Sequence, residues 1–352
     1  MRVNKIQIDG RSIGSDYPPY IVAEISANHN GNLERALDII SMAKAMGADA
    51  IKLQTYTADS LTIDSDQPDF QIQGGLWDGY SLYELYEWAQ TPYSWHKVMF
   101  NHAAKLGITC FSTPFDESAV DFLEDLNAPA YKIASFEAID LNLISYAAQT
   151  RKPMIISTGM ANLTEIEEAV ETVRESGCTD LILLHCISSY PAPVDQSNLL
   201  TIPDLSKRFK VITGLSDHTL GTAVAVASIA LGASMIEKHV TMSRNEKGAD
   251  SEFSLEPNEL RCLCDDTMDA WKSLGVAGYD RKIAEQDSLK FRRSLYAVKN
   301  IAAGELITKE NIRRIRPGFG LPPKYFDKVI GRKARVSILK GQPLDWSLMD
   351  KY

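Results

Sequence analysis

The sequence predicts a (β/α)₈ TIM barrel, an α/β fold, followed by a small mostly-β module. Two observations lead to this fold class. Eight short, β-branched segments alternate with longer helical patterns over about 260 residues, which is the count and size of such a barrel. The rest of the chain changes to short strands, basic side chains and turn signals. A doubly wound open sheet is the alternative, although such a sheet rarely needs eight regular units.

The chain starts with a predicted β-hairpin over Arg2–Ile13, which turns at Asp9-Gly10. Runs of apolar and β-branched residues then predict the strands of the barrel. These strands are expected at Tyr20–Ser26, Ala50–Thr55, Thr109–Thr113, Ala130–Ala134, Pro153–Thr158, Leu181–Cys186, Val211–Leu215 and Met235–His239.

Residues at helical spacing fill the stretches between these strands. Asn162, with Glu165 three residues later, is typical of a helix start. Helices are expected at Leu33–Met46, Trp95–Leu106, Ser118–Leu126, Leu163–Ser176 and Thr222–Leu231, and a further helix at Pro257–Leu274 closes the barrel. Left-handed C-caps are expected at Gly47, Gly107, Gly177 and Gly232.

These elements divide the chain into three parts. Residues 1–277 form the barrel with its hairpin, residues 278–291 form a polar linker, and residues 292–352 form the mostly-β module, with turns at Ala303-Gly304 and Lys340-Gly341. The last part has 14 basic and 5 acidic residues, whereas the rest has 23 and 41. This asymmetry indicates either two modules that attract each other or a basic module that serves an anionic ligand.

Composition excludes several classes of protein. The net charge of −9 argues against a general binder of nucleic acid or of anionic membranes. Five cysteines without a CxxC motif indicate neither a disulfide framework nor a thiolate zinc site. Neither a membrane-spanning run nor a signal peptide is recognisable, so we expect a cytoplasmic protein. The glycine fingerprints of Rossmann and P-loop proteins are missing as well.

Polar side chains gather at the carboxyl ends of the predicted strands, where barrels of this class carry their chemistry. A charge inside a barrel is costly unless it is paired or bound to a ligand. We therefore interpret five charged residues at interior-type positions as functional rather than as packing residues: Glu24, Lys52, Lys132, Glu237 and Lys238.

Two kinds of site follow from these residues. Lys52 and Lys132, together with nearby hydroxyls, suit an anion that carries phosphate and carboxylate groups. His218 and His239 come from adjacent strands and converge on one divalent metal, and Glu24 completes a His₂–carboxylate set suited to Mn²⁺, Co²⁺ or Zn²⁺. The alternative is that either histidine is only a hydrogen-bonding core residue.

The segment Thr57–Thr91 is long for a connection between a strand and the next helix. It is rich in aromatic residues, among them Trp77, Tyr83 and Tyr86. Either it buries one face of a short helix, or it forms a lid over a sugar-like ligand.

Several motifs of the predicted barrel stand out: Ala23–Gly31, Lys52–Thr55, Phe111–Phe115, Tyr131–Ser135, Ile156–Met160, Gly214–His218 and Ile236–His239. In the same order and over nearly the whole chain, they resemble motifs of the sialic acid synthase family. The tail segments Arg292–Leu295 and Arg316–Gly318 resemble that family's antifreeze-like (SAF) domain.

Within the family, three further segments are similar to the branch that makes pseudaminic acid. They are Gln54–Asp59, Ser81–Tyr86 and Thr91–His96, and Ala134–Glu137 agrees with them. The chain departs from the N-acetylneuraminate branch at Ser188, where that branch tends to carry asparagine.

The resemblance implies condensation of phosphoenolpyruvate with an open-chain amino sugar, 2,4-diacetamido-2,4,6-trideoxy-altrose, to give pseudaminic acid and phosphate. It implies catalytic roles for Glu24, His218 and His239, the two histidines holding a divalent metal, with Mn²⁺ favoured over Co²⁺ or Mg²⁺. It implies a domain-swapped homodimer in which Arg316 reaches the partner's site. The implied substrate-binding residues are Lys52, Gln54, Thr113, Lys132, Ser135, Glu137, Ser157, Ser188, Tyr190, Ser216, Asp250 and Arg316.

Two other functions stay open at this point. The chain could be another synthase of the family that makes N-acetylneuraminate or legionaminic acid, or that serves a surface or spore polysaccharide. Alternatively, it could be a non-catalytic sugar- or ice-binding protein that uses the tail module. The buried charges argue against the last function, because a simple binder has no need of them.

Overall fold

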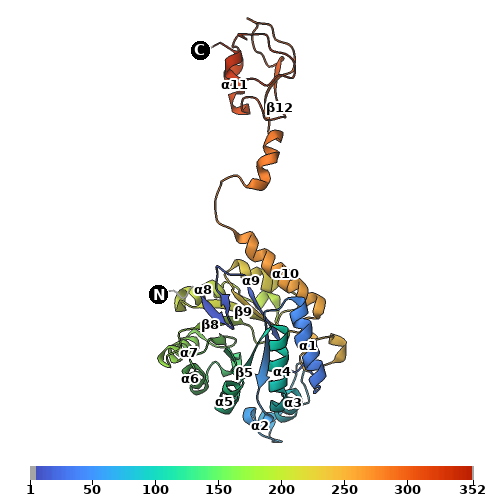
Figure 1. Ribbon diagram of the computed structural model, residues 1–352, viewed down its shortest axis with the longest axis vertical. Coiled ribbons are helices and arrows are strands. Elements are labelled where there is room, and N and C mark those ends of the chain that lie inside the picture. The colour runs from blue at the N-terminus through green and yellow to red at the C-terminus, as the bar shows by residue number, and fades with distance from the viewer. Residues whose placement is uncertain (1–4, 351–352) are drawn as a thin grey trace. The chain divides into compact units, whose positions relative to one another are not determined.

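The eight predicted strands close into one parallel barrel in the computed structural model, which describes residues 5–350 (Figure 1). Closure follows from the pairing of the last barrel strand with the first, in which His239 stands opposite Glu24. The open-sheet alternative is therefore wrong. The strands are β3 (Tyr20–Glu24), β4 (Ala50–Thr55), β5 (Thr109–Pro114), β6 (Tyr131–Ile133), β7 (Met154–Ser157), β8 (Leu181–Cys186), β9 (Ile212–Asp217) and β10 (Met235–His239).

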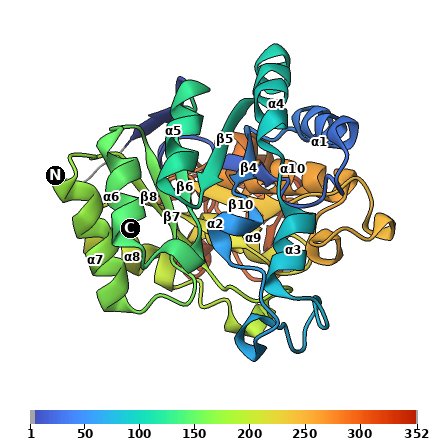
Figure 2. The ribbon, with the colours of Figure 1, turned by 90° about the horizontal axis from the view of Figure 1, so that it is seen from below.

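Helices surround the strands (Figure 2). They are α1 (Leu33–Met46), α4 (Tyr93–Leu106), α5 (Glu117–Asp125), α6 (Leu141–Gln149), α7 (Leu163–Glu175), α8 (Thr201–Phe209), α9 (Ala223–Ala230) and α10 (Pro257–Leu274). The helix boundaries agree with the predicted ones to within about two residues, because capping residues near each end determine where a helix starts and stops. Asn162 and Glu165 form a capping box at the start of α7, and Gly47 and Gly107 are left-handed caps of α1 and α4.

Strand alternation gives the barrel two different faces. On β3, Ile21 and Ala23 belong to the apolar layer between strands and helices. Tyr20 and Val22 point the other way and contribute to an apolar cluster inside the barrel, and Glu24 follows on this inner face. The interior is therefore apolar at the amino ends of the strands and becomes polar toward their carboxyl ends.

The N-terminal hairpin covers the apolar end of the interior. Strands β1 (Ile6–Ile8) and β2 (Arg11–Ile13) pair antiparallel, and positions 2–4 of the predicted hairpin lie outside the described residues. Asp9 and Gly10 both have positive φ, as a tight two-residue hairpin turn requires. Ile6, Ile8 and Ile13 are buried in the same cluster as the inner residues of the strands, so the hairpin excludes water from this end.

The aromatic segment between β4 and α4 lies at the opposite end of the barrel from the hairpin (Figure 1). It contains α2 (Ala58–Leu61), the 3₁₀ turn η1 (Pro68–Phe70) and α3 (Leu82–Ala89). Capping boxes start both helices, formed by Thr57 with Ser60 and by Ser81 with Glu84. The segment is thus an ordered pair of short helices joined by a loop.

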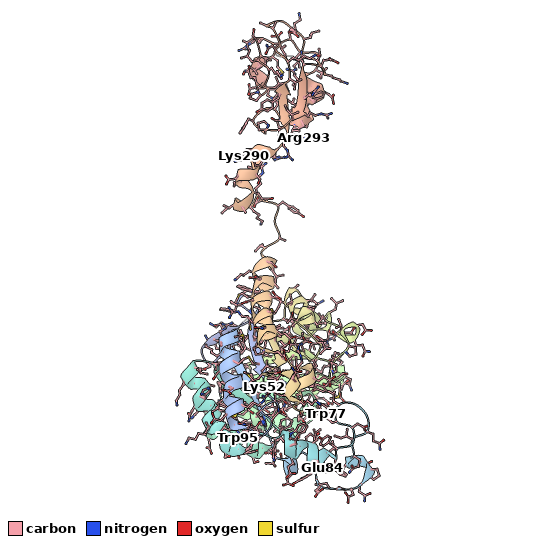
Figure 3. All side chains as sticks on the ribbon, turned by 90° about the vertical axis from the view of Figure 1, so that its right-hand side faces the viewer. Lys52, Trp77, Glu84, Trp95, Lys290 and Arg293 are labelled. Atoms are coloured by element: carbon pink, nitrogen blue, oxygen red, sulfur yellow. The ribbon has the colours of Figure 1, made fainter. Side chains whose placement is uncertain are left out.

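Residues 276–352 form a second compact unit, separate from residues 1–275. The stretch predicted as a polar linker contains a 3₁₀ segment, η6 (Ile283–Phe291). Beyond it, β11 (Ser294–Ala297) pairs antiparallel with β12 (Ile312–Ile315), and α11 (Phe326–Val329) follows. An apolar core of its own, with Leu295, Ile307 and Ile338 fully buried, stabilises this mostly-β unit. Lys290 and Arg293 stand where it begins (Figure 3).

Within residues 5–350, none of the helices combines the length and apolar character needed to cross a bilayer.

Candidate active site

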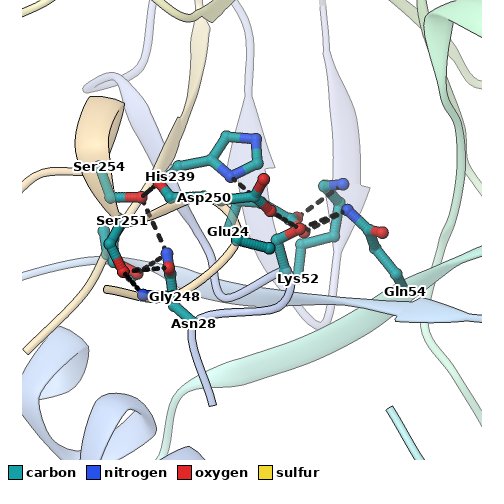
Figure 4. Close-up of polar contacts among 12 residues, drawn as sticks. Glu24, Asn28, Lys52, Gln54, His239, Gly248, Asp250, Ser251 and Ser254 are labelled. Carbon is teal, nitrogen blue, oxygen red and sulfur yellow. Dashed lines mark hydrogen bonds and ion pairs between the residues drawn. The ribbon is translucent and has the colours of Figure 1, made fainter. Parts of the chain in front are cut away.

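Four charged side chains meet inside the polar end of the barrel. Lys52 Nζ lies 2.6 Å from Glu24 Oε2 and 3.7 Å from Glu237 Oε1. Lys132 Nζ lies 3.1 Å from the same Glu237 oxygen. All four residues are at most 4% exposed, although they lie next to the cavity described below. We call Glu24, Lys52, Lys132 and Glu237 the charge cluster; Figure 4 shows its Glu24 side with Lys52 and Gln54.

Burial and pairing set the pKa values in the charge cluster. Burial raises the pKa of Glu24 and outweighs the opposing effect of Lys52. Burial also lowers the pKa of Lys132, against the pull of Glu237. At Glu237, burial is outweighed by Lys132 and Lys52, so its pKa is lowered. The two carboxyl groups of the cluster therefore differ, because the pKa of Glu24 is raised and that of Glu237 is lowered.

Lys238 does not belong to this cluster, contrary to the prediction from its strand position. Strand alternation turns it to the face opposite Glu237, where it stands beside Ala23 of the outer layer. There its Nζ lies 2.7 Å from Asp217 Oδ2 and donates a hydrogen bond to the carbonyl of Thr219. The other oxygen of Asp217 accepts hydrogen bonds from the backbone amide and hydroxyl of Thr219. This pair is fully satisfied within the chain.

Hydroxyl groups surround the two lysines of the charge cluster. Thr113 accepts a hydrogen bond of 3.2 Å from Lys52, and Ser216 donates one of 3.2 Å to Glu237. The hydroxyl of Ser157 is buried and has no partner within the described residues. Thr113 and Ser216 thus both contact the charge cluster.

Gly159 brings two further predicted residues together. A Cβ at this position would lie 2.2 Å from Ser188 Oγ and 2.7 Å from Ser135 Oγ, so only glycine lets these hydroxyls approach. Ser135 also accepts a hydrogen bond of 3.1 Å from the Gly159 amide. Three consecutive strand ends therefore present serine hydroxyls to the same region.

His218 and His239 face each other with ring centroids 5.4 Å apart. The ring of Tyr190 is 4.4 Å from that of His218, and Phe253 packs 5.0 Å from His239. His218 Nδ1 is 3.0 Å from the carbonyl of Ile187, which leaves its Nε2 available. The Nδ1 of His239 is buried without a hydrogen-bond partner in the described part of the chain. Two imidazoles with free nitrogens fit a divalent cation.

Glu24 is not grouped with these histidines. Its carboxylate turns toward β4, where Lys52 pairs with one oxygen and Gln54 Nε2 donates a 3.1 Å hydrogen bond to the other. Within residues 5–350, no three His, Cys, Asp or Glu side chains are arranged as a metal-binding group. The carboxylate in reach of the histidines is Asp250, whose Oδ2 is 3.9 Å from His239 Nδ1.

A cavity of about 430 Å³ adjoins the histidines and is large enough for a small ligand. One part of its wall is polar, and the other part is apolar and comes mainly from the aromatic segment. The polar part is formed by Ser26, Gln54, Glu137, Tyr190, His239 and Asp250. The apolar part includes Leu61, Ile72, Leu82, Leu85, Ala89 and Phe115. The short helix predicted for the aromatic segment is therefore formed, and residues of this segment line a cavity, whereas the lid over a sugar-like ligand stays a prediction.

Hydrogen bonds fix the loop that carries Asp250 (Figure 4). Ser26 donates a short hydrogen bond to the Asp250 carboxylate. The side chain of Asn28 donates a hydrogen bond to Ser254 and accepts one from Ser251, so the segment that follows β3 is bonded to this loop. From the aromatic segment, Trp77 Nε1 donates a 3.0 Å hydrogen bond to the carbonyl of Ala249. Residues far apart in sequence thus position one carboxylate.

Glu137 stands on the 3₁₀ turn η2 (Ser135–Glu137) after β6. Its Oε2 is buried without a hydrogen-bond partner among the described residues. Burial raises the pKa of Glu137 to about 7. A carboxyl group in this state holds or releases a proton near neutral pH.

Arg316 lies in the second unit and is exposed. It follows β12, in which Arg313 and Arg314 are exposed too. The other predicted site residues all lie in the first unit, around the charge cluster, the histidine pair and the cavity.

Two residues of this region, Ser26 and Cys186, were not singled out from the sequence. Glu237 was interpreted as functional from its strand position, and Trp77 was named only as part of the aromatic segment. Cys186 is buried, and its Sγ lies 3.8 Å from His218 Nδ1. Only the three-dimensional structure shows that Ser26 and Trp77 hold the loop of Asp250.

Comparisons with known proteins agree with this arrangement. The NeuB family model matches residues 39–279, and the SAF domain model matches residues 292–348. The pseudaminic acid synthase of Campylobacter jejuni is 45% identical over 95% of this chain and 97% of its own length. The pseudaminic acid synthase of Helicobacter pylori is 43% identical over 93% and 96%.

Solved structures show the same fold. The N-acetylneuraminic acid synthetase of Leptospira borgpetersenii superposes with a TM-score of 0.73 at 31% identity, covering 82% of this chain and 96% of that one. A spore coat polysaccharide biosynthesis protein of Bacillus subtilis gives a TM-score of 0.67 at 31% identity, covering 99% of both chains. This chain therefore belongs to the NeuB family of sialic acid synthases and carries a SAF domain.

Proposed function

We propose that this protein condenses phosphoenolpyruvate with 2,4-diacetamido-2,4,6-trideoxy-L-altrose and water to give pseudaminic acid and phosphate. The observation that carries the proposal is the charge cluster, with two buried lysines, beside a cavity that has one polar and one apolar wall. The identities of 43–45% to two pseudaminic acid synthases support the choice of sugar, since a legionaminic acid synthase is 36% identical.

Phosphoenolpyruvate fits the charge cluster because its phosphate and carboxylate need cations and hydroxyl donors in a dry site. Lys52 and Lys132 supply the cations, and Ser135, Ser157 and Ser188 add hydroxyls nearby.

The chain's residues support a stepwise condensation. The methylene carbon of phosphoenolpyruvate attacks the aldehyde carbon of the sugar, so a C–C bond forms and positive charge develops at C2. The carboxylate side of the cluster stabilises that charge, with Glu24 orienting the water that adds to C2. The water gives up a proton as it bonds to C2, and the former aldehyde oxygen takes up a proton to become a hydroxyl group. The new hydroxyl on C2 then loses its proton as the C2–O bond to phosphate breaks, which leaves the keto group of the product and inorganic phosphate.

We propose that His218 and His239 hold a divalent cation, with Mn²⁺ favoured over Co²⁺ or Mg²⁺. When bound, such an ion supplies Lewis-acid polarisation of the aldehyde oxygen. The free nitrogen of His239 and the facing ring of His218 support this assignment. Chelation should abolish turnover, and His239→Ala should lose metal binding yet fold, whereas full activity in metal-free buffer would contradict the assignment.

The cavity wall supports a 6-deoxy sugar. Leu61, Leu82 and Leu85 offer an apolar surface to a methyl group, whereas a hydroxymethyl group would lose hydrogen bonds with water there. Asp250, Gln54 and Tyr190 lie on the polar wall and suit the acetamido and hydroxyl groups. Since phosphoenolpyruvate is a cytoplasmic metabolite, we propose that compartment for the enzyme.

The sugar assignment is tested by phosphate release. The protein is incubated with phosphoenolpyruvate, Mn²⁺ and one of three sugars: the diacetamido-trideoxy-altrose, the legionaminic acid precursor or N-acetylmannosamine. The first should give the highest kcat/KM, and mass spectrometry should find its nine-carbon product. If N-acetylmannosamine were the best substrate, the alternative function as an N-acetylneuraminate synthase would replace this one. If no sugar released phosphate, the condensation itself would be refuted.

We further propose a homodimer in which the second unit of one chain serves the barrel of its partner through Arg316. The exposed guanidinium and the excess of basic over acidic residues in the tail support this role. The test mixes inactive Arg316→Ala protein with inactive Lys52→Ala protein. Mixed dimers should regain one site built from an intact barrel and an intact tail. No recovery after subunit exchange would show that each tail serves its own barrel.

A further inference from the structure

Glu137 has no role in the condensation derived above, although it occupies the wall of the sugar cavity. Its Oε2 is buried without a hydrogen-bond partner among the described residues. The other carboxyl group that lines the cavity, Asp250, accepts a hydrogen bond from Ser26. Glu137 therefore has a carboxyl oxygen available to a ligand in the cavity.

The proposed sugar presents a chemical problem that the charge cluster does not solve. A 5-hydroxy aldehyde exists in water almost entirely as a ring, whereas the condensation consumes the open-chain aldehyde. Ring opening needs a proton delivered to the ring oxygen and another removed from the hydroxyl on C1. A carboxylic acid can do both at once, because its hydroxyl donates while its carbonyl oxygen accepts.

We propose that Glu137 is the acid–base group that opens the sugar ring inside the cavity, so that the protein generates the aldehyde it consumes. This inference rests on the proposed function, since it takes the same sugar as ligand.

The step balances without any other reactant. The protonated Glu137 carboxyl gives its proton to the ring oxygen, and its second oxygen takes the proton of the C1 hydroxyl. The bond between C1 and the ring oxygen breaks, and the C1 oxygen becomes the aldehyde carbonyl. Glu137 ends neutral, with its proton on the other oxygen, and the reverse reaction restores it.

The surroundings of Glu137 support this role. Burial raises its pKa to about 7, Asp140 adds to that shift, and Lys132 and Lys52 oppose it. Burial raises the pKa of Tyr86, which also lines the cavity, and the charge of Glu137 adds to that shift. The acid form needed for ring opening is therefore populated near neutral pH, where an ordinary exposed glutamate would be ionised.

The first experiment compares two sugars in the wild type and in Glu137→Gln. One is the diacetamido-trideoxy-altrose, and the other is the same molecule with hydrogen in place of the C5 hydroxyl, which cannot close the pyranose ring. With the ring-forming sugar, Glu137→Gln should lower kcat/KM about 100-fold, within the usual contribution of general acid–base catalysis. With the open-chain analogue, the two proteins should differ by less than about threefold, because ring opening is bypassed.

A matched variant controls for the loss of one carboxyl group. Glu168→Gln removes an exposed carboxylate on α7 and should leave kcat/KM unchanged for both sugars. A Glu137 that only binds the sugar would depress kcat/KM equally for both sugars in Glu137→Gln, and that result would overturn the inference.

The second experiment watches ring opening without condensation. The two anomers of the ¹³C-1-labelled sugar are followed by NMR exchange spectroscopy, with 2-phospholactate filling the phosphoenolpyruvate site because it cannot condense. The wild type should raise the exchange rate at least tenfold over buffer, and Glu137→Gln should not. Equal acceleration by both proteins would overturn the inference, as would none by a wild type that condenses the same sugar. A wild type that does not condense this sugar at all would instead refute the proposed function.

Discussion

Two buried lysine–carboxylate pairs in this barrel have similar distances and different surroundings. Lys238 and Asp217, 2.7 Å apart, lie between strands and helices, and each is saturated by further hydrogen bonds from or to Thr219. Lys52 and Glu24, 2.6 Å apart, lie inside the barrel next to Glu237, whose Oε2 has no hydrogen-bond partner within residues 5–350.

The difference shows how a functional charge is told from a structural one. Buried polar groups normally have hydrogen-bond partners, so several buried groups without partners at one place indicate a binding site for a ligand. The Lys238 pair leaves nothing for a ligand to bind. The charge cluster holds lysines, carboxylates and hydroxyls beside a cavity, and therefore suits an anion.

The largest effect is expected from Lys52→Met. It removes a cation from the proposed phosphoenolpyruvate site, and kcat/KM should fall by about 10³-fold, as for loss of one preorganised donor. Stability should fall less than in the Lys238 variant described below, because Glu24 keeps its hydrogen bond from Gln54 and Glu237 keeps its pairing with Lys132. Phosphate release and thermal unfolding measure the two quantities. Wild-type turnover in this variant would contradict the claim that the Lys52–Glu24 pair is functional and the Lys238–Asp217 pair structural.

Lys238→Met should show the opposite pattern. It leaves Asp217 charged and buried without its cation, which costs about 3–5 kcal/mol in the free energy of unfolding. The protein that remains folded should keep its kcat, because Lys238 faces away from the cluster. Urea unfolding and active-site titration would check this. A stable but inactive variant would place Lys238 in the chemistry after all.

The cavity sharpens the comparison by separating the two substrates. Leu82→Ala should lower kcat/KM for the 6-deoxy sugar about tenfold, because one apolar contact with a methyl group is lost. The KM for phosphoenolpyruvate should stay within twofold. Initial rates at varied concentrations of each substrate separate the effects. An increase confined to the KM for phosphoenolpyruvate would mean that the binding regions are assigned the wrong way round.

The smallest effect concerns pH and stability. Burial raises the pKa of Glu137 from 4.5 to about 7, so the folded state is favoured at low pH and loses that contribution as pH rises through this window. Glu137→Gln lacks this dependence. Its Tm relative to wild type should therefore rise between pH 4.5 and 7, equivalent to about 1 kcal/mol after allowance for partial exposure. A constant Tm difference would show that Glu137 keeps its ordinary pKa.

The fold was readable from the sequence because its signals are local. Alternating strands and helix caps such as Asn162 with Glu165 fixed the boundaries of most elements to within two residues. The exposed linker was the exception, since nothing in its polar composition indicates the 3₁₀ segment at Ile283–Phe291.

The site was readable only in part. Residue type and strand position identified Lys52 and Lys132. They also suggested Lys238, but its side chain lies on the outer face of β10, on the side opposite Glu237. Glu24 was grouped with the two histidines because the sequence does not show its actual partners. In the structure its carboxylate contacts Lys52 and Gln54 instead of the histidines. The link between Trp77 and Ala249 joins residues 172 positions apart, and no local pattern reports it.

The central claim, that the charge cluster is the binding site of phosphoenolpyruvate, is tested most directly by titration calorimetry. Wild type and Lys52→Met, both shown to be folded by thermal unfolding, are titrated with phosphoenolpyruvate in the absence of sugar. The account predicts that wild type binds and that Lys52→Met binds at least 100-fold more weakly, as expected for loss of charge-assisted hydrogen bonds worth about 2–3 kcal/mol. Equal affinity in the two proteins would contradict it.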